Sequence, residues 1–129
     1  MKKILWLSRH EMTQEQYADL TDIFGSDIEV KEYKESVNSA ADVLKIGEDC
    51  DVLAVVLPPA MLADLTNPRI NTARKPVIRA VADRVETDIV AINPATGKEE
   101  RQFKFVHKAW EQVLKIEVVT KTLSKSNES

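Results

Sequence analysis

Three polar residues directly follow a short apolar run near the N-terminus and are the side chains best placed for chemistry. Ser8, Arg9 and His10 come immediately after Ile4–Leu7. A serine hydroxyl can donate to a phosphate oxygen, an arginine can bind phosphate through two parallel N–H groups, and a histidine exchanges protons near neutral pH. This triplet predicts an anion site with a general acid or base beside it. Taken singly, each residue also has an ordinary strand-end or surface interpretation.

Two further segments are expected at the same edge as this triplet, because ligands bind at the carboxyl ends of the strands in open α/β sheets. Pro58 and Pro59 follow the nearly continuous apolar run Val52–Leu57, and Arg84 follows the predicted strand Val77–Val81. The prolines fix the turn into the next helix, and we prefer that architectural role over direct ligand contact. Arg84 is the better second anion contact.

Thr13 and Arg79 complete the candidate substrate contacts. Thr13 precedes a predicted helix, whose first backbone amides form a natural anion site. Arg79 lies within the predicted fourth strand, so it either reaches a ligand or simply crosses the sheet edge. His107 shares one face of a predicted strand with Arg101, and for this pair we prefer a packing role within a hairpin.

Composition excludes several familiar kinds of site. The chain has 129 residues with three glycines, one cysteine and two histidines. It therefore has no glycine-rich nucleotide fingerprint, disulfide framework or cysteine-based zinc site, and we predict no metal and no cofactor. Cys50 has no basic neighbour, which argues against a reactive thiolate. A net charge of −3 argues against duplex nucleic acid as a partner, since that requires a broad basic face.

An α/β frame is needed to bring the candidate residues together, and the apolar pattern of the first half predicts one. Strands that alternate with helices favour right-handed crossovers and a parallel sheet. Thr13 and Gln16 are spaced as a capping box for the first helix, and Gly25 ends it. The predicted elements are the strand Ile4–Leu7, a helix between Thr13 and Gly25, a strand around Ile28 and Val30, a helix between Ser39 and Gly47, the strand Val52–Leu57 and the helix Ala60–Leu65.

The second half departs from this alternation. Its predicted elements are the strand Val77–Val81, a hairpin of Asp88–Ile92 and Arg101–Val106 around Asn93–Gly97, a short helix with Trp110, Val113 and Leu114 on one face, and a last strand Ile116–Val119. The predicted fold class is therefore α/β, a small Rossmann-like and mainly parallel sheet flanked by helices with a C-terminal β-hairpin addition. Residues 1–123 form one domain, and the small, polar residues 124–129 form a disordered tail.

The N-terminal apolar run bears on localisation. It spans four residues before Ser8, which is far too short for the core of a signal peptide or for a membrane span. A single cysteine also suits a reducing compartment. We therefore expect a cytoplasmic protein without a membrane partner.

Two families resemble the opening of the chain. The order strand, Arg9, His10, helix is superficially similar to the histidine phosphatase superfamily, in which glycine follows the Arg-His pair. Here Glu11 takes that place and puts a negative charge where a phosphate must enter, and His107 is the one candidate for a second catalytic histidine. This match covers about three residues.

A longer resemblance is to the small stand-alone ring nucleases of type III CRISPR systems, which have a CARF-like Rossmann fold. In those proteins the first strand runs into a Ser-His or Ser-Arg-His triplet and then a segment like Leu-Thr-x-Glu-Gln. Residues 7–16 here read Leu-Ser-Arg-His-Glu-Met-Thr-Gln-Glu-Gln, and residues 51–63 are similar to their central strand, Leu-Pro turn and following helix. The matches cover the first half of the chain. From Pro76 onward the sequence departs from the pattern.

The resemblance implies a cyclic oligoadenylate ligand, held across the two-fold axis of a homodimer and cleaved without metal when a ribose 2′-OH attacks the adjacent phosphodiester. As a hypothesis, Arg9 and the amides at the first helix start hold phosphate, and His10 assists proton transfer. Ser8 orients the scissile group, and Arg84 neutralises a neighbouring phosphate. Two alternatives stay open at this point: a sensor or sponge that binds the nucleotide without cutting it, and a structural or interaction protein.

Overall fold

The strands form a five-stranded, mainly parallel sheet with three helices packed on it. A computed structural model describes residues 1–117 and 119–124 of the chain. The strand order is β2-β1-β3-β4-β5, with β1 to β4 parallel and β5 antiparallel to β4. The elements in chain order are β1 (Lys2–Leu7), α1 (Gln14–Phe24), β2 (Ile28–Tyr33), α2 (Ala40–Ile46), β3 (Val52–Val55), α3 (Pro59–Leu65), β4 (Val77–Ile92) and β5 (Glu99–Gln112).

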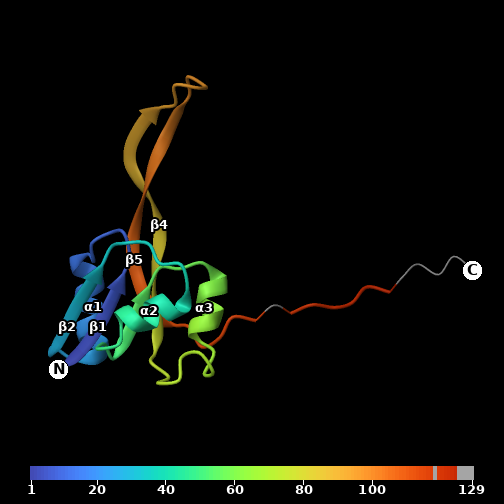
Figure 1. Cartoon of the computed structure of the whole chain (residues 1–129). Coiled ribbons are helices and arrows are strands. Elements are labelled where there is room, and N and C mark those ends of the chain that lie inside the picture. Colours follow the sequence, from blue (N-terminus) through green and yellow to red (C-terminus); the bar gives the residue numbers. More distant parts are fainter. Residues whose placement is uncertain (118, 125–129) are drawn as a thin grey trace, which may run out of the picture.

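The helices cover opposite faces of the sheet (Figure 1). On one face, Leu20 of α1 packs with Ile4, Trp6 and Val52. On the other face, α2 and α3 pack against the alternate residues of the same strands. This second cluster contains Leu5, Leu7, Ala40, Val43, Leu53, Val55, Leu62 and Leu65. Because β1 and β3 are buried on both faces, their sequences are almost continuously apolar, as central parallel strands require.

Local capping signals set the helix boundaries as predicted. The Thr13 hydroxyl accepts from Gln16 N at 3.1 Å, and the Gln16 side chain accepts from Thr13 N at 2.9 Å, which completes the capping box. Gly25 ends α1 with a φ of 92°, a backbone conformation that favours glycine. The Ser39 side chain caps α2 in the same way as Thr13 caps α1.

The hairpin is longer than predicted and incorporates the fourth strand. Instead of a strand Val77–Val81 followed by a separate Asp88–Ile92 segment, β4 runs without interruption for 16 residues and pairs with the 14 residues of β5. β3 pairs with β4 only at its first two residues, Val77 and Ile78. Beyond them β4 has β5 alone as a neighbour, and the pair projects from the sheet (Figure 1).

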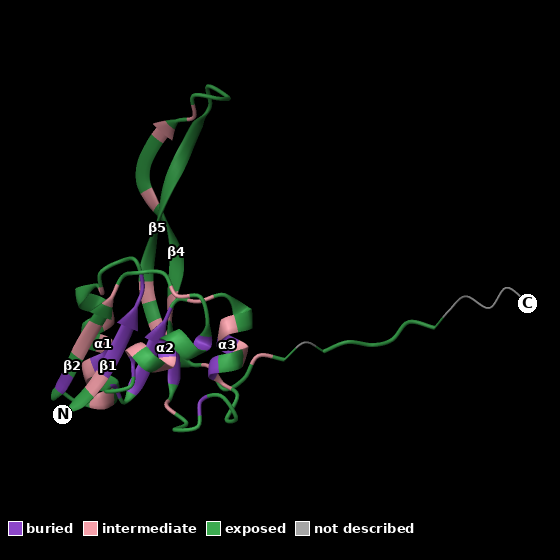
Figure 2. Cartoon of the chain, viewed as in Figure 1, coloured by how far each residue is buried: buried purple, intermediate pink, exposed green. Residues whose placement is uncertain are grey.

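We call residues 83–106 the arm and the helix-covered remainder of the sheet the body. Figure 2 shows the contrast: the buried residues lie in the body, and the arm is almost entirely exposed. Parallel β4 leaves the body at the edge where β1 and β3 end. The arm therefore rises from the edge at which the sequence places the candidate site. The turn at Asn93–Gly97 forms as predicted, with Gly97 at a φ of 69°.

Two C-terminal predictions are wrong. Trp110 belongs to β5 rather than to a short helix, and Val113 and Leu114 follow that strand without regular structure. Residues 116, 117 and 119 are not in a strand either, and residue 118 lies outside the described residues. Of the tail predicted at 124–129, residue 124 has no regular structure, and 125–129 lie outside the described part. Within the part that the structure describes, no helix is long and apolar enough to cross a membrane.

Candidate functional site

A small cleft opens at the carboxyl edge of the sheet, between the ends of β1, β2 and β3 and the start of α3. Its volume is about 180 Å³. Ten residues line it: Leu7, Ser8, Arg9, Glu35, Ser36, Val37, Val56, Leu57, Pro58 and Met61. We call this the edge cleft. It lies where the chain order reverses, since β1 leads to β2 on one side and β3 lies on the other, and such switch points are where open α/β sheets bind ligands.

Ser8, Arg9 and Pro58 are thus brought together from distant parts of the sequence, as predicted. Ser8 is buried, and its hydroxyl accepts from the backbone N–H of His10 at 3.1 Å. This bond turns the chain sharply after β1. Arg9 is exposed, and its Nη2 donates to the Ser36 hydroxyl at 3.0 Å. Arg9 is the one cation among the lining residues of the edge cleft, and Glu35 the one anion.

His10 lies beside the edge cleft rather than in it. Its carbonyl accepts from Trp6 Nε1 at 2.9 Å, so the buried indole fixes the backbone at this position. The residue is exposed, and no side chain in residues 1–117 or 119–124 hydrogen-bonds to its ring. Glu11, the next residue, forms an ion pair with Lys34 at 3.2 Å. Its negative charge is therefore partly balanced at the entrance to the site.

Thr13 and Pro59 do not line the edge cleft. Thr13 borders a separate depression of about 520 Å³, together with Met12, Gln14, Tyr17 and Glu32. Its hydroxyl is engaged with Gln16 N, so the capping box already uses one of the α1 amides proposed for phosphate. Pro59 is the first residue of α3, a position that suits proline because its missing N–H would be unpaired there anyway. The architectural interpretation therefore fits Pro59.

Arg79 and Arg84, the two other arginines predicted as ligand contacts, do not line the edge cleft either. Arg84 is not beyond a strand end but in the middle of β4, on the arm, where its guanidinium lies 3.8 Å from the centre of the Phe103 ring. Arg79 is exposed on β4 and pairs with Glu111 on β5 at 3.6 Å. Arg79 lies within the strand, as predicted, whereas the prediction for Arg84 depended on β4 ending near Val81. Because the strand continues, its polar residues are carried away from the body.

A junction between α1 and β5 was not anticipated. His107 Nε2 lies 2.9 Å from Asp19 Oδ2, and the His107 side chain is only 7% exposed. Trp110 Nε1 donates to the Gln16 carbonyl at 3.0 Å, and its ring meets Trp6 edge to face at 5.6 Å. These contacts anchor the base of the arm on the body. The sequence predicted a packing role within the hairpin, whereas His107 packs against α1, and its partner Asp19 was not predicted.

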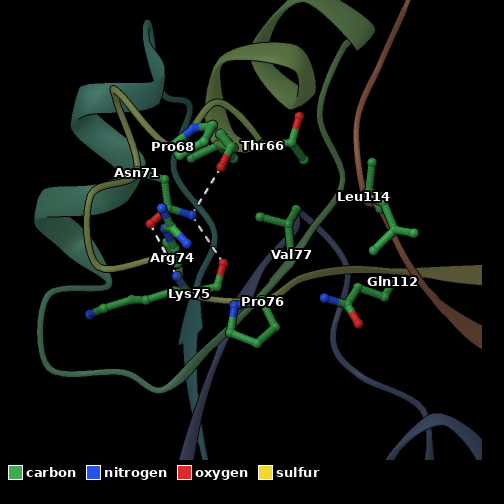
Figure 3. A pocket seen from close by; sticks show the side chains of 11 residues that line it. Thr66, Pro68, Asn71, Arg74, Lys75, Pro76, Val77, Gln112 and Leu114 are labelled. Atoms are coloured by element: carbon green, nitrogen blue, oxygen red, sulfur yellow. Dashed lines mark hydrogen bonds between the residues drawn. The ribbon is translucent and has the colours of Figure 1, made fainter.

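A polar hollow elsewhere in the described chain is structural. It lies at the opposite end of the sheet from the edge cleft, where the α3–β4 connection meets the segment after β5, and has a volume of about 280 Å³ (Figure 3). The buried Asn71 amide donates to the carbonyls of Leu65 and Lys75 and accepts from Lys75 N. The Lys75 ammonium donates to two carbonyls at the end of α2. These polar groups hold the chain and are not available to a ligand.

Cys50 and Asp49 have pKa values that are shifted by their surroundings. Burial raises the pKa of the Cys50 thiol, so the thiolate is disfavoured, as predicted. Asp49 receives hydrogen bonds from Lys3 and Lys31, which hold its pKa well below the usual range. Among the residues described, no three histidine, cysteine or carboxylate side chains gather as a metal site.

Comparison with known proteins gives no family for this chain. No family model, curated protein or solved structure matches it. The geometry of the edge cleft therefore carries the functional argument.

Proposed function

We propose that the edge cleft binds one phosphodiester of a cyclic oligoadenylate and that the protein cleaves this ligand without metal, as a ring nuclease with a CARF-like Rossmann fold. The observation that carries the proposal is the convergence of Ser8, Arg9 and Pro58 on one cleft at the switch point between β1 and β3. These residues belong to the two segments that resemble the family. The strand order β2-β1-β3-β4 with helices on both faces is compatible with that fold class.

Arg9 is suited to hold the phosphate. A guanidinium has five N–H donors in a planar fork, and its hydrogen bond to Ser36 uses one nitrogen. The remaining donors can bind two phosphate oxygens in parallel, the strongest geometry for such a pair. The Ser36 contact also limits the motion of the side chain before ligand binds. Glu35, which also lines the cleft, disfavours a second anion, so the cleft suits one phosphate rather than a polyphosphate.

The proposed chemical step needs positioning more than a strong nucleophile. The ribose 2′-oxygen attacks the adjacent phosphorus in line, and the bond from phosphorus to the 5′-oxygen breaks, leaving a 2′,3′-cyclic phosphate and a 5′-hydroxyl. His10, which lies directly after Arg9, takes the 2′-OH proton or returns a proton to the leaving oxygen. Arg9 stabilises the extra negative charge on the pentacoordinate phosphorus. The cleft would therefore stabilise this transition state more than it stabilises the bound substrate.

The size of the edge cleft limits what one copy can hold. Ligand pockets usually exceed about 300 Å³, whereas this cleft measures about 180 Å³. It has room for a phosphate and part of a sugar, not for a whole cyclic oligonucleotide. A ring of identical phosphodiesters instead suits two identical clefts related by a two-fold axis. The proposed function therefore includes a homodimer as the binding unit.

The test is incubation of the purified chain with labelled cyclic tetra- and hexa-adenylate in a metal chelator. We expect linear products that carry 2′,3′-cyclic phosphate. Arg9→Ala should abolish binding, and His10→Ala should slow cleavage by about 10²-fold or more, the usual contribution of a general acid or base, while leaving binding intact. Arg69→Ala, an exposed arginine in the α3–β4 connection, is the matched control. Intact ligand with no detectable binding would contradict both cleavage and sensing.

A sensor or sponge is the second candidate, and one observation favours it. The His10 ring has no hydrogen-bond partner among the described side chains that would hold it in position for proton transfer. Tight binding without turnover, unchanged by His10→Ala, would select this alternative. If Arg9→Ala and His10→Ala both leave every nucleotide assay blank, as wild type does, the protein is a structural or interaction protein instead.

A further inference from the structure

The arm exposes a set of apolar side chains that no part of the described chain covers. Five residues stand out by their exposed fraction: Phe105 at 76%, Ile92 at 68%, Ile89 at 60%, Val90 at 50% and Phe103 at 47%. An isolated two-stranded hairpin is marginally stable in water and needs a further layer packed on it. Exposed apolar patches of this kind mark interaction surfaces. We therefore expect a binding partner to cover these side chains of the arm.

The strand register places all of these side chains except Ile89 on one face. Residues directly opposite in an antiparallel pair point to the same side, and this side alternates along each strand. Between Glu86 and Val90 lie three residues of β4, and a single residue of β5, Gln102, lies opposite them, so the alternation is kept. We call the resulting surface the Phe face. It consists of Arg84, Glu86, Val90, Ile92, Glu99, Arg101, Phe103 and Phe105.

The charges on the Phe face identify the kind of partner. Its two arginines and two glutamates cancel, so it has no net charge to attract a nucleic acid or an anionic membrane. Arg101 lies 3.5 Å from Glu86, and Arg84 stacks on Phe103, so cations, anions and aromatic rings alternate along the face. A two-fold axis that lies across the strands reverses the order of these cross-strand rows, so Arg84 of one copy comes near Glu99 of its twin, and Glu86 comes near Arg101. Such an axis matches residues of one copy with those of its twin.

We propose that the Phe face binds the Phe face of a second copy of this chain, forming a two-fold dimer through the arms. In that arrangement each apolar stripe covers the other, and the arginines of one copy lie against the glutamates of its twin. The arm is roughly 30 Å long and 10 Å wide, so the buried area falls below that of a standard interface of ~1,600 Å². The dimer is therefore concentration-dependent. This inference goes beyond the proposed function and holds whether or not the edge cleft binds nucleotide.

Sedimentation velocity of the full chain over a dilution series tests the dimer. Wild type should pass from monomer to dimer as its concentration rises. The double variant F103S/F105S should remain monomeric at every concentration with an unchanged circular dichroism spectrum. The matched control is V85S/V106S, on the opposite face of the arm, where the two valines are 39% and 38% exposed. This control should dimerise like wild type. A wild type that stays monomeric up to its solubility limit would overturn the proposal, as would equal loss in both double variants.

Charge variants give an independent test that does not remove apolar packing. R84E/R101E makes all four charges of the Phe face acidic, and E86R/E99R makes all four basic. Each variant alone should be monomeric because identical charges then meet across the axis. An equimolar mixture should form a heterodimer that weakens as salt is added. If each variant dimerises as well as wild type, or if the mixture stays monomeric, the arms do not pair through this face.

Discussion

The body and the arm are built from similar β-forming sequences, yet the body buries its side chains and the arm exposes them. Leu53 and Val55 of β3 have helices on one side of the sheet, and Val52 and Ala54 have a helix on the other. Ile92 on β4 has solvent around it. The difference lies in the connections, because crossover helices cover a parallel sheet, whereas a hairpin turn brings no helix with it. We infer that the body holds the proposed ligand site and the arm the proposed dimer contact.

The largest effect should come from a large-to-small substitution in the body. Leu53 is fully buried, and Leu53→Ala should lower the free energy of unfolding by about 2–5 kcal/mol, through lost burial and the cavity left behind. Phe105→Ala on the arm should change it by less than about 0.5 kcal/mol in dilute solution. Urea denaturation below the dimerisation range measures both. Comparable losses in the two variants would mean that the arm is as tightly packed as the body.

The next effect concerns the junction between the two regions. Trp110→Ala removes the hydrogen bond to the Gln16 carbonyl and the contact with Trp6, and should lower the free energy of unfolding by about 2 kcal/mol. Hydrogen exchange should accelerate at the base of the arm and in α1 but not in β3. Protection lost equally in β3 would show that body and arm are one cooperative unit.

A smaller effect is expected at the start of α1. Thr13→Ala should lower the free energy of unfolding by about 1 kcal/mol, because the Gln16 amide loses its cap. Thr13 does not line the edge cleft, so nucleotide binding should be unchanged. Thr72→Ala, in an exposed connection, serves as the control. A loss of binding without a loss of stability would place Thr13 in the ligand site after all.

The smallest effect is a pH dependence at Asp49. Its folded pKa is lowered by hydrogen bonds from Lys3 and Lys31 relative to an unfolded value of about 3.9. The contribution to stability is therefore present above the unfolded pKa and is lost as the pH falls through the folded pKa. Wild type should lose more stability than Asp49→Asn between neutral and acid pH in urea titrations. Parallel losses would show that these exposed ion pairs contribute nothing.

The sequence predicted the body better than the arm for a physical reason. In the body, burial on defined faces produces apolar periodicity, and caps such as Thr13 with Gln16 mark the boundaries. On the arm, both faces meet solvent, so polar residues such as Asp83 and Arg84 look like the end of a strand. The helical spacing of Trp110 and Val113 was equally misleading, because an odd number of extended residues places them on opposite faces of the sheet, where each packs on an apolar cluster.

The residues of the candidate site were also predicted better in the body than on β4 and β5. Ser8, Arg9 and Pro58 all precede β4 in the sequence. They converge because they follow the central parallel strands β1 and β3, which end at the same edge of the sheet. Arg84 was misplaced because the length of β4 was not visible in its sequence, whereas Arg79 lies within β4 as predicted and pairs with Glu111. His107 pairs with Asp19, which lies 88 positions away in the sequence, and no local sequence pattern reveals such a contact.

The central claim, that the body edge and not the arm holds the ligand, is tested most directly by nuclear magnetic resonance with cyclic tetra-adenylate. Titrating the labelled wild-type chain at a concentration at which it is dimeric keeps the proposed binding unit intact. We predict amide shifts at Ser8, Arg9, Ser36 and Met61, with the arm resonances between Asp83 and Val106 unmoved. Shifts confined to the arm, or no shifts at saturating ligand, would contradict the account.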